Sequence, residues 1–414
     1  MRNVILTLVS ALAVGTAISA VSAGPPSVQA QTRSSSPTQA VVVAADAFLK
    51  TLSPELRAKV QFPFTPQKNA TLATFARSGG PPGGSRGRGD AGDRGDAGRQ
   101  GGDPGRQGGD PGRQGGRGGP GGGGFAGFVG EKYGDAVWSN FPVSDVPRPG
   151  IKIGDLSTEQ RNALMHLLQV LLSANGYQKV LDIMGSDQAL ADGGTNFSSG
   201  TAFYTVGIFG TPSATTPWML QYGGHHLGLN VVFVQANGVM TPTLTGAQPA
   251  VYTANGKTVR VLAQENDKAF ALMDALDAGQ RTQAILNFRV GDLVLGPGQD
   301  AKTIAPEGLK GSAMTEAQRT RLLDLISQWS GIVNDGFAAP RLAEIKAGLS
   351  ETYFAWSAPT THEPNRNGTS YYRIQGPKLF IEFSPQGVGG DPSNHVHTMY
   401  RDPTNDYGRA LLNQ

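Results

Sequence analysis

The sequence predicts an α+β fold, in which a largely antiparallel sheet has helices packed on one side. Strand-like segments rich in β-branched and aromatic residues gather in two regions, 200–236 and 351–401. Several are joined by short turns, such as "QGPK" between Ile374 and Leu379, and short connections require antiparallel pairing. The helical patterns lie outside these two regions and do not alternate with single strands, which disfavours a wound parallel sheet.

The helices are predicted from capping signals and apolar periodicity. Residues 38–60 have a helical pattern, and within it Ser53 can cap a new helix that has Pro54 at its first position. Ser157 with Gln160, and Thr315 with Gln318, fit the capping box, and an amphipathic helix follows each of them. Two further helices are expected at 262–286 and 338–347.

The strands are predicted from runs of residues with high β-propensity that end at Gly, Pro or Asn. The two histidine-containing runs are "HHLGLNVVFVQ", which begins at His225, and "HVHTMY", which begins at His395. The remaining runs are "AFYTVGIFG", "PWMLQYG", "TYFAWSA", "SYYRIQG" and "KLFIEFS". The last of these runs and "HVHTMY" are expected to form a hairpin.

Composition divides the 414 residues into five parts. Arg2 precedes a long apolar run that ends in small residues, which is typical of a cleaved signal peptide. We therefore expect a secreted or periplasmic protein that does not remain in the membrane. Cysteine is absent, so the fold has no disulfide. The parts are a signal peptide (1–30), a spacer (31–37), an N-terminal helical part of the globular domain (38–77), a low-complexity insertion (78–124) and the main globular part (125–414).

The insertion consists almost entirely of Gly, Arg, Asp, Pro and Gln, and it repeats the unit "GRQGGDP". Without apolar residues it cannot offset its ordering entropy, so it is predicted to be disordered. Its two Arg-Gly-Asp triplets, at 88–90 and 94–96, are better explained by composition than by cell adhesion. Arg and Asp nearly balance there and the net charge of the chain is only +3, which argues against a nucleic-acid partner. A role as a spacer or anchor stays open.

Three long motifs resemble a known family. These are "FGTPSATTPWMLQYGGHHLGLNVVF", "YYRIQGPKLFIEF" and "NHVHTMYRDPTNDYG". Together with the block Trp138–Pro142 they are similar, in sequence and in order, to the secreted family called domain of unknown function 3500. The resemblance covers residues from about 38 to the C-terminus and implies a shared fold without a known activity. The family pattern has Trp and an acidic residue before the double histidine, where this chain has Leu220–Gly224, so any role of that acid is missing here.

Four of the six histidines lie in two short apolar stretches, His225–His226 and His395–His397. Residues two apart in a strand share a face, so His395 and His397 should bring their rings together. Neighbours in a strand face opposite sides, so only one of His225 and His226 should join them unless the strand bends after Gly223 and Gly224. We favour His226, which shares its face with Gly228 and Asn230; His225 would then need a hydrogen-bond partner in the core.

Imidazoles that converge in this way suit a divalent metal such as Zn, Fe, Mn or Cu. Glu382, in the apolar strand "LFIEF", is a candidate ligand or general base, provided that the strand register places it beside His395 and His397. Arg373 and Arg401 also interrupt strand-like runs. They are candidates for ion pairs with Glu382 or Asp402, or for binding an anionic substrate.

Two classes of function are therefore open. The first is a metal-dependent enzyme, a hydrolase or an oxidoreductase, that acts on a small-molecule substrate through His226, His395 and His397, with His225 as a further candidate ligand. A variant of this class uses a histidine as general base without a metal. The second is a non-catalytic binding or structural protein whose histidines form a buried hydrogen-bond network. Outside the low-complexity insertion the sequence lacks nucleophile-elbow, phosphate-loop and His-Glu-x-x-His motifs.

Overall fold

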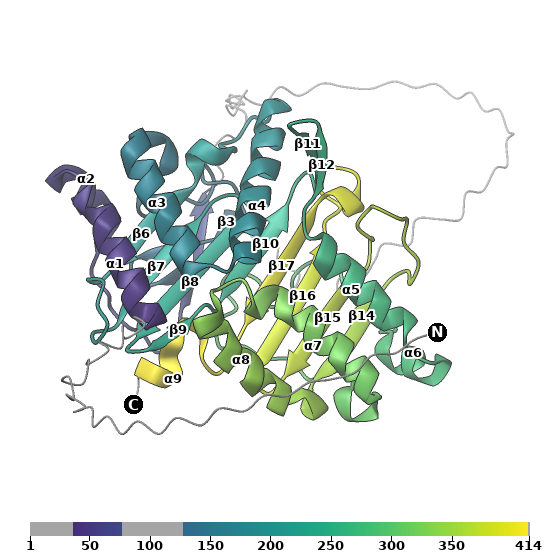
Figure 1. Cartoon of the computed structure of the whole chain (residues 1–414). Coiled ribbons are helices and arrows are strands. Elements are labelled where there is room, and N and C mark those ends of the chain that lie inside the picture. The colour runs from purple at the N-terminus through teal and green to yellow at the C-terminus, as the bar shows by residue number, and fades with distance from the viewer. Residues whose placement is uncertain (1–35, 77–126, 413–414) are drawn as a thin grey trace, which may run out of the picture. The chain divides into compact units, whose positions relative to one another are not determined.

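The computed structural model describes residues 36–76 and 127–412 (Figure 1). The predicted signal peptide and low-complexity insertion lie outside these described residues, and so does most of the predicted spacer. Within the described ranges, no helix is long and apolar enough to cross a membrane.

A twelve-stranded sheet is the centre of the described fold. Neighbouring strands pair antiparallel, except for the parallel pair β1–β6. This confirms the α+β prediction and the largely antiparallel sheet. Two short strands, β5 (Ile151–Lys152) and β9 (Asn237–Val239), pair with β6 and β8 beside the main order. That order is β1 (Gln61–Phe62), β6 (Thr205–Phe209), β7 (Trp218–Gly223), β8 (Leu227–Val234), β10 (Thr243–Ala247), β17 (Val396–Arg401), β16 (Leu379–Pro385), β15 (Tyr371–Gly376), β14 (Tyr353–Ser357) and β13 (Leu309–Lys310).

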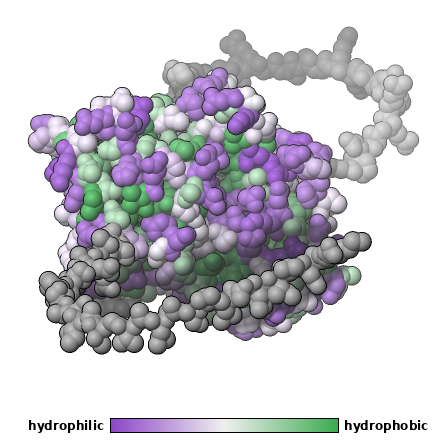
Figure 2. All heavy atoms as spheres, in the orientation of Figure 1, coloured by the Kyte–Doolittle hydropathy of each residue, from purple (hydrophilic) through white to green (hydrophobic). Residues whose placement is uncertain are grey.

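Helices cover one face of this sheet and bury the larger apolar core against it (Figure 1). Seen from this side, the surface is mainly polar, and apolar side chains show between the helices (Figure 2). The helices are α1 (Pro37–Lys50), α2 (Pro54–Val60), α3 (Thr158–Leu171), α4 (Ala174–Asp192), α5 (Ala263–Asp274), α6 (Ala278–Ala284), α7 (Glu316–Ser330) and α8 (Asp335–Ala347), and a short α9 (Arg409–Leu412) follows near the C-terminus.

The predicted helix starts are confirmed, with one correction. Ser157 and Thr315 form the expected capping boxes at α3 and α7, and Ser53 caps α2. The single helix expected at 262–286 is wrong, because the chain forms α5 and α6 with a break between them. Asp277 caps α6 in a further capping box, which starts a new helix after the first has ended.

The opposite face of the sheet is covered by different structures. A three-stranded sheet of β2 (Thr71–Ala76), β3 (Gly127–Tyr133) and β4 (Ala136–Trp138) lies there, and Trp138 packs against Leu244 and Met399 of the main sheet. The segment 286–308 also lies over this face, because its backbone at Leu295 binds Glu382. A separate hairpin consists of β11 (Val251–Ala254) and β12 (Lys257–Arg260).

The sheet is built from two halves with the same order of elements. The first half runs β5–α3–α4–β6–β7–β8–β10, and the second runs β13–α7–α8–β14–β15–β16–β17. The two halves meet at β10 and β17, so the strand order is mirrored about this central pair. Equivalent hydrogen bonds connect the helix layer: Ser173 N donates to Ile332 O at 3.0 Å, and Asn334 N donates to Leu171 O at 2.9 Å. We conclude that a pseudo-twofold axis relates the halves.

This symmetry gives the β7–β8 turn a counterpart in the second half. The β7–β8 turn lies between Gly224 and Leu227, and the β15–β16 turn lies between Gly376 and Leu379. The flanking pairs correspond as well, because Gly223 pairs with Gly228 and Gln375 pairs with Phe380. His225 and His226 therefore occupy the positions that Pro377 and Lys378 occupy in the second half.

Candidate metal site

His225 and His226 form the tight turn between β7 and β8. Gly224 N donates a hydrogen bond to Leu227 O at 2.9 Å, which closes a turn with the two histidines at its centre. The expectation for a straight strand, with the two side chains on opposite sides, is therefore wrong. The chain instead bends after Gly223 and Gly224, which is the exception expected from the sequence. Their rings instead stack face to face, with centroids 3.8 Å apart and planes inclined by 26°.

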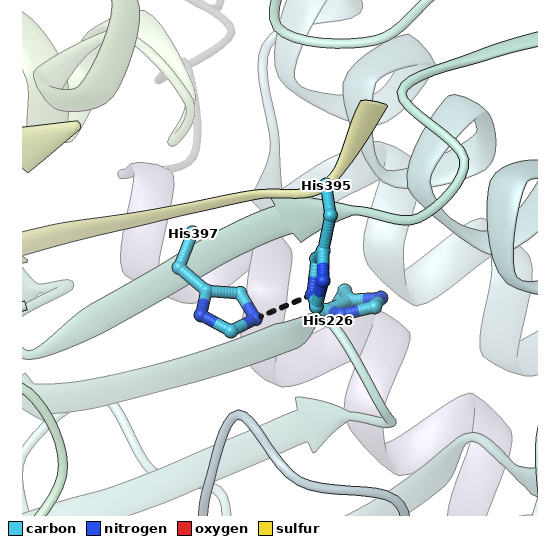
Figure 3. A group of neighbouring side chains, drawn as sticks. All are labelled: His226, His395 and His397. Atoms are coloured by element: carbon cyan, nitrogen blue, oxygen red, sulfur yellow. Dashed lines mark hydrogen bonds between the residues drawn. The ribbon is translucent and has the colours of Figure 1, made fainter. Parts of the chain in front are cut away.

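His395 and His397 lie where β17 begins, on the sheet face opposite the helices. Their Nε2 atoms are 3.1 Å apart. The ring of His226 reaches the same point from the β7–β8 turn (Figure 3), so ligand nitrogens of all three side chains lie within 4.8 Å of one another. The meeting of the two histidine stretches, expected from the sequence, is what the structure shows.

The spacing of the three rings fits a shared metal ion. A Zn–N bond of about 2.0–2.1 Å puts a ring centroid about 3 Å from the ion and neighbouring centroids about 5 Å apart at a tetrahedral angle. The observed centroid separations are 5.3 Å for His226–His395, 5.4 Å for His226–His397 and 4.8 Å for His395–His397.

Gly246 of β10 makes room for the rings. It pairs with His397 across the central strands. A Cβ atom at this position would lie 3.3 Å from His397 Cδ2, 3.4 Å from His226 Cδ2 and only 2.8 Å from the backbone oxygen of Val396. The absence of a side chain thus leaves room for the imidazole of the β7–β8 turn and the imidazole of β17 to approach each other.

The three histidines differ in their hydrogen bonds. His395 Nδ1 lies 2.8 Å from Val388 O; a carbonyl only accepts, so Nδ1 carries the proton and Nε2 presents its lone pair to the site. Such support of a ligand histidine is common around metals. His226 is fully buried, and both of its ring nitrogens lack a hydrogen-bond partner among the described residues. Buried polar atoms are rarely left unpaired, so His226 requires an additional group.

Burial keeps these imidazoles neutral. It lowers the pKa of His226 well below the usual value, and the neighbouring His225, His397 and His395 lower it further. The pKa of His397 is also well below normal, first through burial and then through His395 and His225. Burial lowers the pKa of His395, although its bond to Val388 acts in the opposite direction. Neutral imidazoles are the form that binds metal ions.

Asp187 of α4 supports His225. Its Oδ1 lies 3.0 Å from His225 Nδ1, and its Oδ2 accepts from Gly200 N at 2.9 Å. Asp187, His225 and His226 form a second group with ligand atoms close together, but rings stacked at 3.8 Å cannot both direct in-plane lone pairs at one ion. We therefore assign Asp187 and His225 to holding the ring of His226 from one side.

Residues 130–409 match a protein family described as "Protein of unknown function (DUF3500)". The chain belongs to this family. No curated protein and no solved structure matches the chain. The matched range contains all four clustered histidines together with Asp187 and Gly246, so the site lies entirely inside the DUF3500 region. Helices α1 and α2 precede the matched range.

Glu382 does not join the histidines of this DUF3500 chain, although it lies on the same face of the sheet. The register pairs Ser384 with His397 and Glu382 with Met399. Glu382 therefore lies two residues farther from the histidines along the strands. The Glu382 carboxylate accepts bonds from Val294 N, Leu295 N and the Tyr371 hydroxyl at 2.7–2.8 Å. Burial raises its pKa, against these hydrogen bonds. The Glu382 carboxylate therefore holds the backbone of the segment 286–308 against the sheet.

Arg373 and Arg401 form ion pairs, but neither pairs with Glu382 or Asp402 as the sequence suggested. Arg373 binds Glu307. Arg401 binds Glu131 of β3 and, at 2.9 Å, Asp406. Arg401 lies four residues beyond His397, about 13 Å farther along the strand. The sequence could not identify these partners, because they come from segments that only folding brings to β17.

The Asp406 carboxyl beside Arg401 should make stability depend on pH. Burial raises its pKa from 3.8 to about 7, although the charge of Arg401 opposes this shift and Asp300 adds to it. Between those two values the folded state binds more protons than the unfolded state, so the free energy of unfolding should fall as the pH rises. Urea unfolding across this range should show that fall in the wild type and a flatter profile in Asp406→Asn. Parallel profiles would contradict it.

Asp187 and Gly246 were not predicted from the sequence, and two further residues at the site were not predicted either. Asn140, just after β4, places Nδ2 3.4 Å from His397 Nδ1. Arg148 donates to Gly224 O, next to the histidine turn, at 3.1 Å. Asn140 lies in the Trp138–Pro142 block that contributes to the family resemblance, which was the one available signal. Arg148 had none.

Proposed function

We propose that this protein binds one divalent transition-metal ion through His226, His395 and His397, with Zn²⁺ as the first candidate. The single observation that carries the proposal is the buried imidazole of His226, whose two nitrogens have no hydrogen-bond partner among the described residues and which faces two other neutral imidazoles. A metal ion satisfies a nitrogen lone pair that nothing else among the described residues reaches.

The internal symmetry supports a functional origin for these histidines. The equivalent turn of the second half consists of Pro377 and Lys378 and has the same strand pairing on both sides. The fold can therefore build this turn without histidine. The buried imidazole of His226 is then explained by a local role, and metal binding is a role that uses its neutrality and its approach to His395 and His397.

Three histidine ligands leave a coordination position for water or substrate, as in catalytic zinc sites. Zinc in such a site lowers the pKa of a bound water to about 7, which supplies a hydroxide for hydrolysis. We propose a metal-dependent enzyme acting on a small molecule, with hydrolysis as the reaction if the ion is Zn²⁺. An oxidoreductase is the alternative if the ion is Fe, Cu or Mn.

We further propose that the protein acts outside the cytoplasm. The support is the sequence "MRNVILTLVSALAVGTAISAVSA", in which a basic start is followed by an apolar run and small residues. The N-terminal mass of the protein recovered from the medium or periplasm tests this proposal: a start at Met1 in cell-associated protein contradicts it.

The alternative hypothesis, a non-catalytic protein whose histidines form a structural network, has one observation in its favour. A continuous hydrogen-bond chain can form without a metal, and it runs from Asn140 through His397 and His395 to Val388. A buried network of this kind can stabilise a unique core. It leaves His226 unpaired, however, which is why we favour the metal site.

Metal analysis of the purified mature protein distinguishes the metal site from the metal-free hydrogen-bond network. We expect about one equivalent of bound metal per chain, and competition titration with a chromophoric chelator should show that His395→Ala loses it. His166→Ala is the matched control, because His166 is exposed on α3 and lies outside the site. Wild-type protein that takes up no Zn²⁺, Fe²⁺, Mn²⁺ or Cu²⁺ would refute the proposal.

A further inference from the structure

The loop after β4 is attached to the histidine turn through one guanidinium. Besides Gly224 O, Arg148 donates to the backbone oxygens of Ser139 and Phe141 at 2.7 and 2.6 Å. Asn140 lies between these two residues. The backbone around Asn140 is therefore fixed relative to the turn that carries His226.

The hydrogen bonds define where the protons of the metal-free site lie. His395 Nδ1 must donate to Val388 O, so His395 Nε2 is an acceptor. His397 Nε2, at 3.1 Å from it, must then be the donor. A neutral His397 consequently has its lone pair on Nδ1, where it faces the Asn140 Nδ2 donor at 3.4 Å. Every proton in this chain is accounted for, and His397 is in the tautomer that cannot bind a metal through Nε2.

Metal binding at His397 Nε2 requires the other tautomer, with the proton on Nδ1. The proton leaves Nε2 for solvent and one returns to Nδ1, so the imidazole stays neutral. The group facing Nδ1 must then be an acceptor. Asn140 supplies one if its amide turns over, because the carboxamide has a donor and an acceptor in equivalent positions.

We propose that Asn140 is a positioning residue for the metal site, and that reversal of its amide couples the tautomer of His397 to metal loading. This inference rests on the proposed metal site. When Asn140 Nδ2 faces His397 Nδ1, it stabilises the metal-free network. When Asn140 Oδ1 faces His397 Nδ1, it accepts the proton on Nδ1 and leaves the lone pair of His397 Nε2 free for the ion. Arg148 keeps Asn140 in reach of His397 in both states.

Two substitutions of similar size test the proposal because their effects should have opposite signs. Asn140→Asp presents an acceptor permanently and should bind Zn²⁺ about tenfold more tightly than the wild type. Asn140→Leu removes only a long, 3.4 Å contact from the metal-free state but the whole acceptor from the loaded state, so it should bind Zn²⁺ about 10–100-fold more weakly. A merely structural role for Asn140 would weaken binding in both variants, and that result, or two unchanged affinities, would overturn the inference.

Long-range ¹H–¹⁵N spectra of the histidine rings give a second readout. In the wild type, His397 should be protonated on Nε2 without metal and on Nδ1 with Zn²⁺, while His395 keeps its proton on Nδ1 in both states. An unchanged His397 tautomer in zinc-loaded protein would also overturn the proposal. If the wild type binds no metal at all, the proposed function fails; if it binds metal and these effects are absent, only the role of Asn140 fails.

Discussion

Replacing His226 by leucine should stabilise the metal-free protein and abolish metal binding. His226 is fully buried, and its two ring nitrogens have no partner in the part of the chain that the structure describes. Each unpaired buried polar group costs about 1–3 kcal/mol. Leucine has a similar volume and no polar atoms. We therefore expect the free energy of unfolding in the presence of a chelator to rise by about 1–3 kcal/mol. A residue maintained for function at a cost in stability behaves in this way.

His225→Leu is the matched control, in the same turn and with the same change of side chain. It should have the opposite effect on stability, because Asp187 Oδ1 would lose its donor inside the protein. We expect a loss of about 1–3 kcal/mol. Chemical unfolding of both variants with and without Zn²⁺ checks the pair. If His226→Leu destabilises the metal-free protein as much as His225→Leu does, His226 is a structural residue and the argument for the site fails.

Arg401→Met should have the largest effect on folding stability. Arg401 is 1% exposed and lies between Glu131 and Asp406, both fully buried. Removing the guanidinium leaves two buried carboxylates without their cation, a change that costs about 3–5 kcal/mol. Arg401 also donates to Leu295 O and Gly296 O at 2.8 Å, so the segment 286–308 should lose hydrogen-exchange protection with it. Urea unfolding and hydrogen exchange measure the two effects.

Two further variants show whether the cost comes from the uncompensated charge. Arg281→Met removes an arginine that pairs with the exposed Asp274, at 3.9 Å, and donates to the backbone oxygens of Leu276 and Asp274. It leaves no buried charge behind and should cost at most about 1–2 kcal/mol. Adding Glu131→Gln to Arg401→Met removes one of the two carboxylates that have lost their cation, and it should restore part of the stability. If the double variant is less stable than Arg401→Met alone, the loss comes from packing and the electrostatic explanation is wrong.

The sequence was most informative where short-range physics determines the structure. The capping box depends on residues only three positions apart, so Ser157 and Thr315 could be identified from the sequence. The strand pattern of β17 likewise placed His395 and His397 on one face. The same rule failed at His225 and His226, because Gly223 and Gly224 end the strand and the chain turns there.

The sequence alone therefore determined the fold class, most helix starts and the shared face of His395 and His397. Only the tertiary structure decided that His226 meets them, that Gly246 leaves the space they occupy, and that Glu382 and Arg401 are engaged by other segments. The physical reason is the distance along the chain over which each interaction acts. Capping and side-chain alternation act over a few residues, whereas the site is assembled by strand register and by loops more than a hundred residues apart in the chain. No local pattern in the sequence encodes those contacts.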